Sequence, residues 1–158
     1  LSGALFAHLA GISMTHVPYK GTGPATADLL GGHVDLMFAT TPGALPYVRS
    51  NRLRALAVTG KKRSGAAPEL PTVAESGLPD YEFVGWYGML VRSGTPAAAI
   101  ERLHAETARI LAAEDVRQLL ADQGGQLTGL APREFDAYLR TEIRRWAGVI
   151  AETKIRLD

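Results

Sequence analysis

The sequence predicts an α/β fold in which buried parallel strands alternate with short helices, followed by a layer of longer helices. Two apolar runs, Val34 to Ala39 and Leu53 to Val58, have the composition of strands buried on both faces. Turns that contain glycine or proline separate these runs from segments with helical spacing. In the last third of the chain, apolar residues recur at intervals of three and four, which is typical of amphipathic helices.

Strands and helices are expected to alternate through the first half of the chain. Gly11 ends the opening helical pattern, and Gly31 with Gly32 ends the second. Thr22 is expected to cap this second helix, and Pro24 to occupy its first turn. The expected strands are Met14 to Val17, Val34 to Ala39 and Leu53 to Val58, and the expected helices are Leu1 to Leu9, Ala25 to Leu30 and Thr40 to Arg49.

The second half begins with a surface excursion and continues mainly as helix. Thr59 to Asp80 is rich in Lys, Gly and Pro, with a short helical piece expected at Thr72 to Ser76. Tyr81 to Val91 favours a strand, and its glycines at Gly85 and Gly88 predict a bend or hinge. After it we expect a helix capped by Thr95 and Pro96 with Leu103 and Ile110 facing inward, a second helix ended by Gly124 and Gly125, a strand at Gln126 to Leu130 and a last helix opened by Pro132.

The composition excludes several classes of function. The 17 basic and 16 acidic residues are interspersed and give a formal net charge of +1, so no nucleic-acid partner is expected. The absence of cysteine excludes disulfides and thiolate chemistry. Neither a run of about 18 apolar residues nor a signal-peptide pattern occurs. Because the helical pattern is already present at Leu1, we expect that further sequence precedes it.

The turn from His16 to Ala25 is the feature that points most directly to a function. A short extended segment runs through Gly21 and Gly23 into the expected start of a helix. The first N–H groups of a helix have no intrahelical acceptor and lie at the positive end of the helix dipole, so a carboxylate or phosphate is favoured there. A turn of this kind can also serve only to connect two elements, and from the residues alone both interpretations remain open.

A second turn, from Phe38 to Pro42, follows the next expected strand. In a parallel sheet, successive strand-to-helix loops open at the same edge, so two helix starts are expected to face one crevice. Thr40 and Thr41 can donate hydroxyl hydrogen bonds to a carboxylate, although one of them is more simply a helix cap. Tyr19 offers an apolar wall with a polar tip, and Lys20 offers a positive charge.

Common catalytic and cofactor templates are not met. The turn at Gly21 begins like a dinucleotide loop, but Pro24 removes an amide and Thr26 stands where a small residue is needed. No P-loop occurs, the four histidines have no metal-ligand spacing, and no serine lies in a Gly-x-Ser-x-Gly turn. The sequence therefore predicts no enzyme activity, no metal and no cofactor.

Five motifs in order resemble one family of receptors. They are His16 to Gly21, Gly31 to Phe38, Leu53 to Val58, Pro71 to Gly77 and Trp86 to Gly88. Together they are similar to the solute-binding receptors of tripartite tricarboxylate transporters, also called Bug-type receptors. The resemblance implies a two-lobed periplasmic-binding-protein fold of type II, a periplasmic location, a small mono- or dicarboxylate ligand and delivery of that ligand to membrane permease subunits.

The resemblance also implies which part of such a receptor this chain is. Residues 1–80 are expected to belong to the second ligand-binding lobe, and residues 81–158 to the crossover and the C-terminal part of the first lobe. The family's upstream ligand loop has no counterpart here, so the chain is expected to be the C-terminal half of a receptor. Ligand-binding roles carry over by position to nine residues: Tyr19, Lys20, Gly21, Thr22, Gly23, Ala25, Phe38, Ala39 and Thr40.

Three further expectations accompany this interpretation. Sheet edges and apolar helix faces that lack neighbours favour pairing with another copy or a swapped assembly. A small α/β enzyme whose catalytic groups meet only in three dimensions remains an alternative function. A structural module that keeps the fold without a working binding site is the other alternative.

Overall fold

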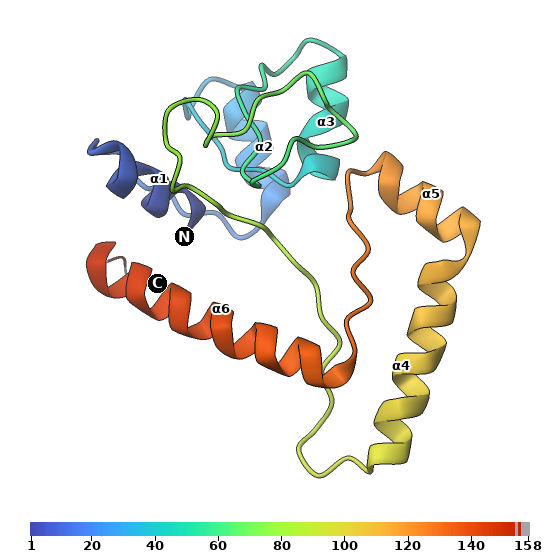
Figure 1. The fold of residues 1–158 in the computed structure, drawn as a ribbon. Coiled ribbons are helices and arrows are strands. Elements are labelled where there is room, and N and C mark those ends of the chain that lie inside the picture. Colours follow the sequence, from blue (N-terminus) through green and yellow to red (C-terminus); the bar gives the residue numbers. More distant parts are fainter. Residues whose placement is uncertain (154, 156–158) are drawn as a thin grey trace. The chain divides into compact units, whose positions relative to one another are not determined.

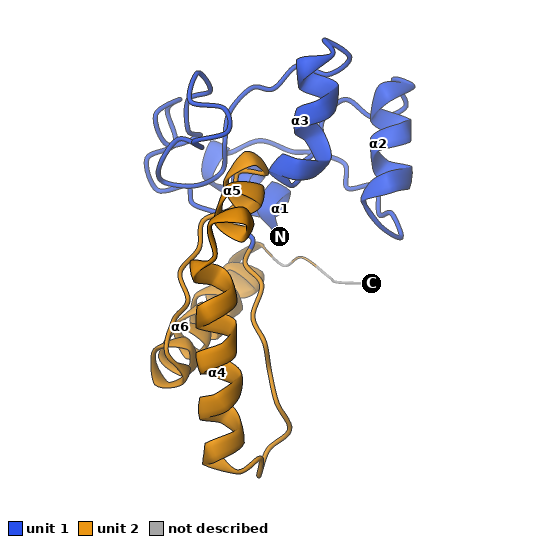
Figure 2. Cartoon of the chain, turned by 90° about the vertical axis from the view of Figure 1, so that its right-hand side faces the viewer, with its two compact units in different colours: residues 1–85 blue, residues 86–158 orange. Residues whose placement is uncertain are grey.

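The computed structural model describes residues 1–153 and residue 155, in two compact units. The first unit comprises residues 1–85 and the second comprises residues 86–158 (Figures 1 and 2). Six helices occur in the described residues, three in each unit. The assignment of these regions to two ligand-binding lobes stays a prediction.

The first unit contains the three helices that the sequence predicts. Helix α1 spans Ser2–Ala10 and ends at Gly11, whose φ of 65° is the left-handed conformation that favours glycine. Helix α2 spans Thr22–Leu30, and helix α3 spans Thr41–Arg49. The prediction that Thr22 caps α2 was wrong, because Gly21 holds the N-cap position and Thr22 is the first helical residue.

The predicted parallel sheet is almost absent from the described residues. The segments expected as strands run as non-helical chain, and within residues 1–153 the only bridges join Val58 to Thr72 in parallel and Ser64 to Ala67 in antiparallel fashion. A strand is stabilised by backbone and side-chain contacts to a neighbouring strand, and these segments have few such neighbours in residues 1–153. Consistent with this, Met14, Leu36 and Leu56 are exposed although their pattern predicts burial.

A small core holds the first unit together around α1. Tyr81 is fully buried, and its hydroxyl lies 2.9 Å from the Ser2 hydroxyl. The Phe6 ring packs against Tyr81 and against Phe38, with ring centroids 6.0 and 5.7 Å apart. Burial of Tyr81 also raises the pKa of its hydroxyl, while the hydrogen bond with Ser2 opposes that rise. The segments that contain Phe38 and Tyr81 are therefore both anchored on α1.

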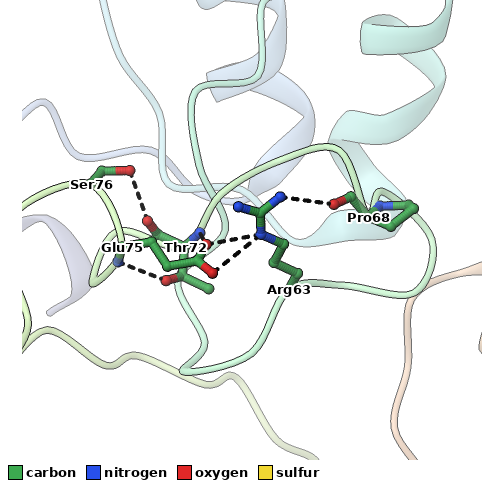
Figure 3. A network of polar contacts seen from close by, with 5 residues as sticks. All are labelled: Arg63, Pro68, Thr72, Glu75 and Ser76. Atoms are coloured by element: carbon green, nitrogen blue, oxygen red, sulfur yellow. Dashed lines mark hydrogen bonds and ion pairs between the residues drawn. The ribbon is translucent and has the colours of Figure 1, made fainter.

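A network of polar contacts closes the turn from Thr72 to Gly77 (Figure 3). The Thr72 N–H donates to Glu75 Oε2 over 2.8 Å, and the Glu75 N–H donates to Thr72 Oγ1 over 3.0 Å. This reciprocal pair is a capping box, although the helical piece predicted here is only a turn. Arg63 donates to the same carboxylate and to the Pro68 carbonyl, which ties the excursion to the turn.

This network predicts a pH-dependent contribution to stability. The backbone N–H of Thr72 and, to a smaller extent, Arg63 lower the pKa of Glu75. A lowered pKa in the folded state means that the contribution is present above the unfolded pKa and is lost as the pH falls through the folded pKa. We expect Glu75→Gln to lower the melting temperature at pH 7, and the difference from the unchanged chain to shrink steadily as the pH falls below the unfolded value of about 4.3. Thermal unfolding across this range measures the difference, and a constant offset at every pH would contradict it.

The second unit is built from three helices, two of which are longer than those of the first unit, and an aromatic cluster. Helices α4, α5 and α6 span Ala97–Ala112, Glu114–Asp122 and Pro132–Thr153, and α4 contacts both others. The prediction that Thr95 caps α4 was wrong, because its hydroxyl donates to the Arg92 carbonyl and Pro96 is the N-cap. Leu103 and Ile110 are 42% and 51% exposed, which corrects their predicted inward placement.

The aromatic cluster joins the segment after residue 85 to α6. The Trp86 ring packs edge-on against Phe135 and Tyr138, with centroids 5.7 and 5.6 Å away. Tyr87 points into solvent, since it is 97% exposed. Within the described part of the chain, none of the helices is long and apolar enough for a membrane crossing.

Candidate functional site

The loop that leads into α2 presents unpaired backbone donors to solvent. Gly21 has φ 138° and ψ 174°, a conformation that side chains with a Cβ rarely adopt. Lys20, Gly21, Thr22 and Gly23 are all exposed. No side chain caps α2, so the first-turn N–H groups of Thr22 and Gly23 are left without a capping partner and are open to an anion.

The start of α3 lies beside the start of α2. Thr40 is the N-cap of α3, and its hydroxyl makes no capping hydrogen bond with the helix. A Cβ placed on Gly43 would lie 3.1 Å from Thr40 Oγ1 and 3.9 Å from Thr22 Cγ2. These contacts, with the adjacent position of α2 and α3 in Figure 2, bring the two helix starts together. The donors there are main-chain N–H groups and the threonine hydroxyls.

Three of the residues predicted to bind ligand remain to be placed. Ala25 and Ala39 lie at the two helix starts, and Phe38 packs near α1. Ala25 is half-buried within α2, and Ala39 is exposed immediately before the α3 start. Phe38 is half-buried, and its ring packs on the Phe6 ring. The Phe38 ring also lies close to Gly3, where an added Cβ would be 3.3 Å from Phe38 Cε2. The Phe38 side chain therefore contributes to the support of the turn.

Tyr19 is tied to a residue that sequence reasoning did not assign to the site. Its hydroxyl donates to Asp28 Oδ2 over 2.7 Å, and His33 Nδ1 lies 3.4 Å from Asp28 Oδ1. The hydrogen bond between Tyr19 and Asp28 is the main cause that raises the pKa of Tyr19 and lowers the pKa of Asp28. His33 makes a smaller contribution to the lowered pKa of Asp28. The spacing of nine residues between Tyr19 and Asp28 gives no sequence signal, because one partner precedes the helix.

This region presents several kinds of chemical group. It combines N–H donors at a positive helix end, hydroxyl donors and one aromatic ring, which together suit a negatively charged group next to an apolar one. Among residues 1–153 and 155, no group of three or more His, Cys, Asp or Glu side chains is placed to hold a metal ion.

A family model matches the chain from residue 1 to residue 155 and describes the tripartite tricarboxylate transporter family receptor. The chain belongs to this family. The resemblance carried by the five sequence motifs is thereby confirmed over nearly the whole chain.

Curated relatives of this receptor family match at moderate identity. The chain is 38% identical over its whole length to the UPF0065 protein in the tcbD-tcbE intergenic region of a Pseudomonas species, and 36% identical over 97% of its length to Protein BugT of Bordetella pertussis. It spans 47% of each of these relatives. A third relative, the UPF0065 protein in the clcB-clcD intergenic region of Pseudomonas knackmussii, is 31% identical, and the chain covers 94% of it.

Solved structures of the same type share the fold. The R. palustris protein Rpa4515 with adipate matches 98% of the chain with a TM-score of 0.90 and 33% identity. The periplasmic binding protein BugD gives 0.88 at 30% identity, and MatC of Rhodopseudomonas palustris with bound malate gives 0.85 at 33% identity. The chain covers 52% of each of these structures. The fold class is therefore that of part of a periplasmic binding protein, as the sequence predicts.

Proposed function

We propose that this chain is part of an extracytoplasmic receptor that binds a small carboxylated solute and delivers it to the permease of a tripartite tricarboxylate transporter. The observation that carries the proposal is the pair of adjacent helix starts without side-chain caps, at Gly21–Thr22 and Thr40–Thr41, in a member of this family. Two structural neighbours hold adipate and malate, which are dicarboxylates. A periplasmic location is part of the same proposal, and the likeness to the periplasmic binding protein BugD supports it.

The site is suited to a carboxylate for an electrostatic reason. Two helix starts that converge add their partial positive charges, and together they offer the N–H groups of Thr22, Gly23 and Thr41, which have no acceptor inside their helices. Threonine hydroxyls at Thr22 and Thr40 supply further donors beside these N–H groups. The Tyr19 ring provides an apolar surface for the carbon chain of the ligand.

Binding without reaction is the chemistry that these groups support. Hydrogen-bond donors hold an anion reversibly, whereas acyl transfer or hydrolysis needs a nucleophile with a positioned base. The relatives are solute-binding receptors, which are not enzymes. Pairing with a second copy through exposed apolar residues such as Met14, Leu36 and Leu56 stays a prediction from the sequence.

Isothermal titration calorimetry of the purified chain tests the binding proposal. Adipate and malate are the first probes, followed by a panel of other mono- and dicarboxylates, and adipamide serves as a neutral analogue of adipate. We expect saturable binding of at least one carboxylate and none of adipamide, because the helix-start donors act on negative charge. If no carboxylate in the panel gave a saturable binding isotherm, the proposal would be contradicted.

A further inference from the structure

Asp28 links the two ends of helix α2. Tyr19, in the loop before the helix, donates a hydrogen bond from its hydroxyl to Asp28 Oδ2 over 2.7 Å. His33, in the turn after the helix, places its Nδ1 atom 3.4 Å from Asp28 Oδ1. The His33 backbone N–H also donates to the Asp28 carbonyl over 2.9 Å. One side chain in the middle of these contacts therefore connects the loop that begins at Tyr19 with the turn that ends at His33.

The position of this carboxylate in the helix is unfavourable by itself. Asp28 lies in the last turn of α2, where the helix dipole is negative and where no basic residue of the helix compensates it. The hydrogen bond from Tyr19 and the nearby imidazole of His33 offset this cost. Helix stability alone does not account for an aspartate here, whereas a need to hold Tyr19 does.

We propose that Asp28 is a positioning residue of the carboxylate site, which holds the Tyr19 ring and thereby the exposed residues 20–23, where the loop enters α2, in their binding conformation. This inference rests on the function proposed above. Because the Tyr19 O–H donates its hydrogen bond to Asp28, the phenol oxygen faces a ligand only as an acceptor. The ligand carboxylate is then held by N–H groups and threonine hydroxyls, and Tyr19 contacts the rest of the molecule.

The order of the loop in the chain without ligand is the first readout. The {¹H}–¹⁵N heteronuclear NOE of residues 20–23 is measured for the unchanged chain and for Asp28→Ala, Tyr19→Phe and Asp28→Asn. We expect values typical of ordered backbone in the unchanged chain and a fall toward values typical of flexible backbone in Asp28→Ala and Tyr19→Phe. Asp28→Asn keeps an acceptor oxygen for Tyr19 and should restore the order of the loop.

Affinity for adipate and malate is the second readout. We expect Asp28→Ala to weaken binding about tenfold, and Asp28→Ala combined with Tyr19→Phe to weaken it no further than either change alone, since the two residues act as a unit. Exposed Glu69 lies in the same compact unit, and Glu69→Ala is the control that should change neither readout. Circular dichroism confirms that each variant is folded.

The outcomes separate this inference from the proposed function. Unchanged loop order in a folded Asp28→Ala chain, or full additivity of the two substitutions in affinity, would overturn the positioning role even if ligand binds well. Loss of loop order in Asp28→Ala and its return in Asp28→Asn support the positioning role. If that result is found in a chain that binds no carboxylate, the proposed function fails while the link between Asp28 and the loop stands.

Discussion

Gly88→Ala is expected to disrupt the aromatic cluster of the second unit. A Cβ on Gly88 would overlap Phe135 Cζ and would lie 3.0 Å from both Phe135 Cε atoms. The Phe135 ring is rigid and packs on Trp86, so it cannot yield without losing that contact. Overpacking of this kind costs about 1–3 kcal/mol, which is a large share of the stability of a small domain.

The effect of Gly88→Ala is measured by thermal unfolding and by the near-ultraviolet circular dichroism of the tryptophans. Gly85→Ala is the matched control, because a Cβ at Gly85 meets nothing within 4 Å. We expect a melting temperature several degrees lower and a weakened tryptophan signal for Gly88→Ala only. Equal melting temperatures for the two variants would show that the packing of Trp86 on α6 does not depend on Gly88.

Gly21→Ala is expected to weaken carboxylate binding by more than tenfold. The φ of 138° at Gly21 is strained for any residue with a Cβ, at a cost of about 1–3 kcal/mol. Nothing lies within 4 Å of the added methyl group, so the effect comes from the backbone conformation and not from a clash. A loop that relaxes to negative φ turns the N–H groups of Thr22 and Gly23 away from the ligand.

Calorimetry with the carboxylate that binds most tightly measures this loss. Gly65→Ala is the control, since Gly65 is an exposed loop glycine of the same unit with open space around it and without a positive φ. The control should keep its affinity. Undiminished affinity in Gly21→Ala would mean that the loop conformation described here is not the one that binds.

The helices could be predicted because their signals are local. Gly11, Gly32 and Gly124 have φ of 65°, 73° and 74°, and each lies just after the end of a helix. Pro132 opens α6 for the same kind of reason, since its fixed φ and missing N–H suit a first helical residue. The two helix starts of the candidate site were found from the same cues.

The strands and the Tyr19 contact could not be predicted in this way. The apolar pattern of Val34 to Ala39 indicates burial in a sheet, but it does not say whether the neighbouring strands lie in this stretch of chain. The relatives BugT and BugD are about twice as long as the portion of them that this chain matches. The bond from Tyr19 to Asp28 depends on how the loop folds back along α2, which no periodicity records.

Nuclear magnetic resonance titration tests the central claim most directly. In ¹H–¹⁵N spectra of the chain, adipate or malate should shift the amide signals of Thr22, Gly23 and Thr41, the first-turn N–H groups of α2 and α3, more than the signals of other residues. Saturation of these shifts at a common affinity is the predicted result. Saturable shifts confined to residues away from these two helix starts would contradict the account.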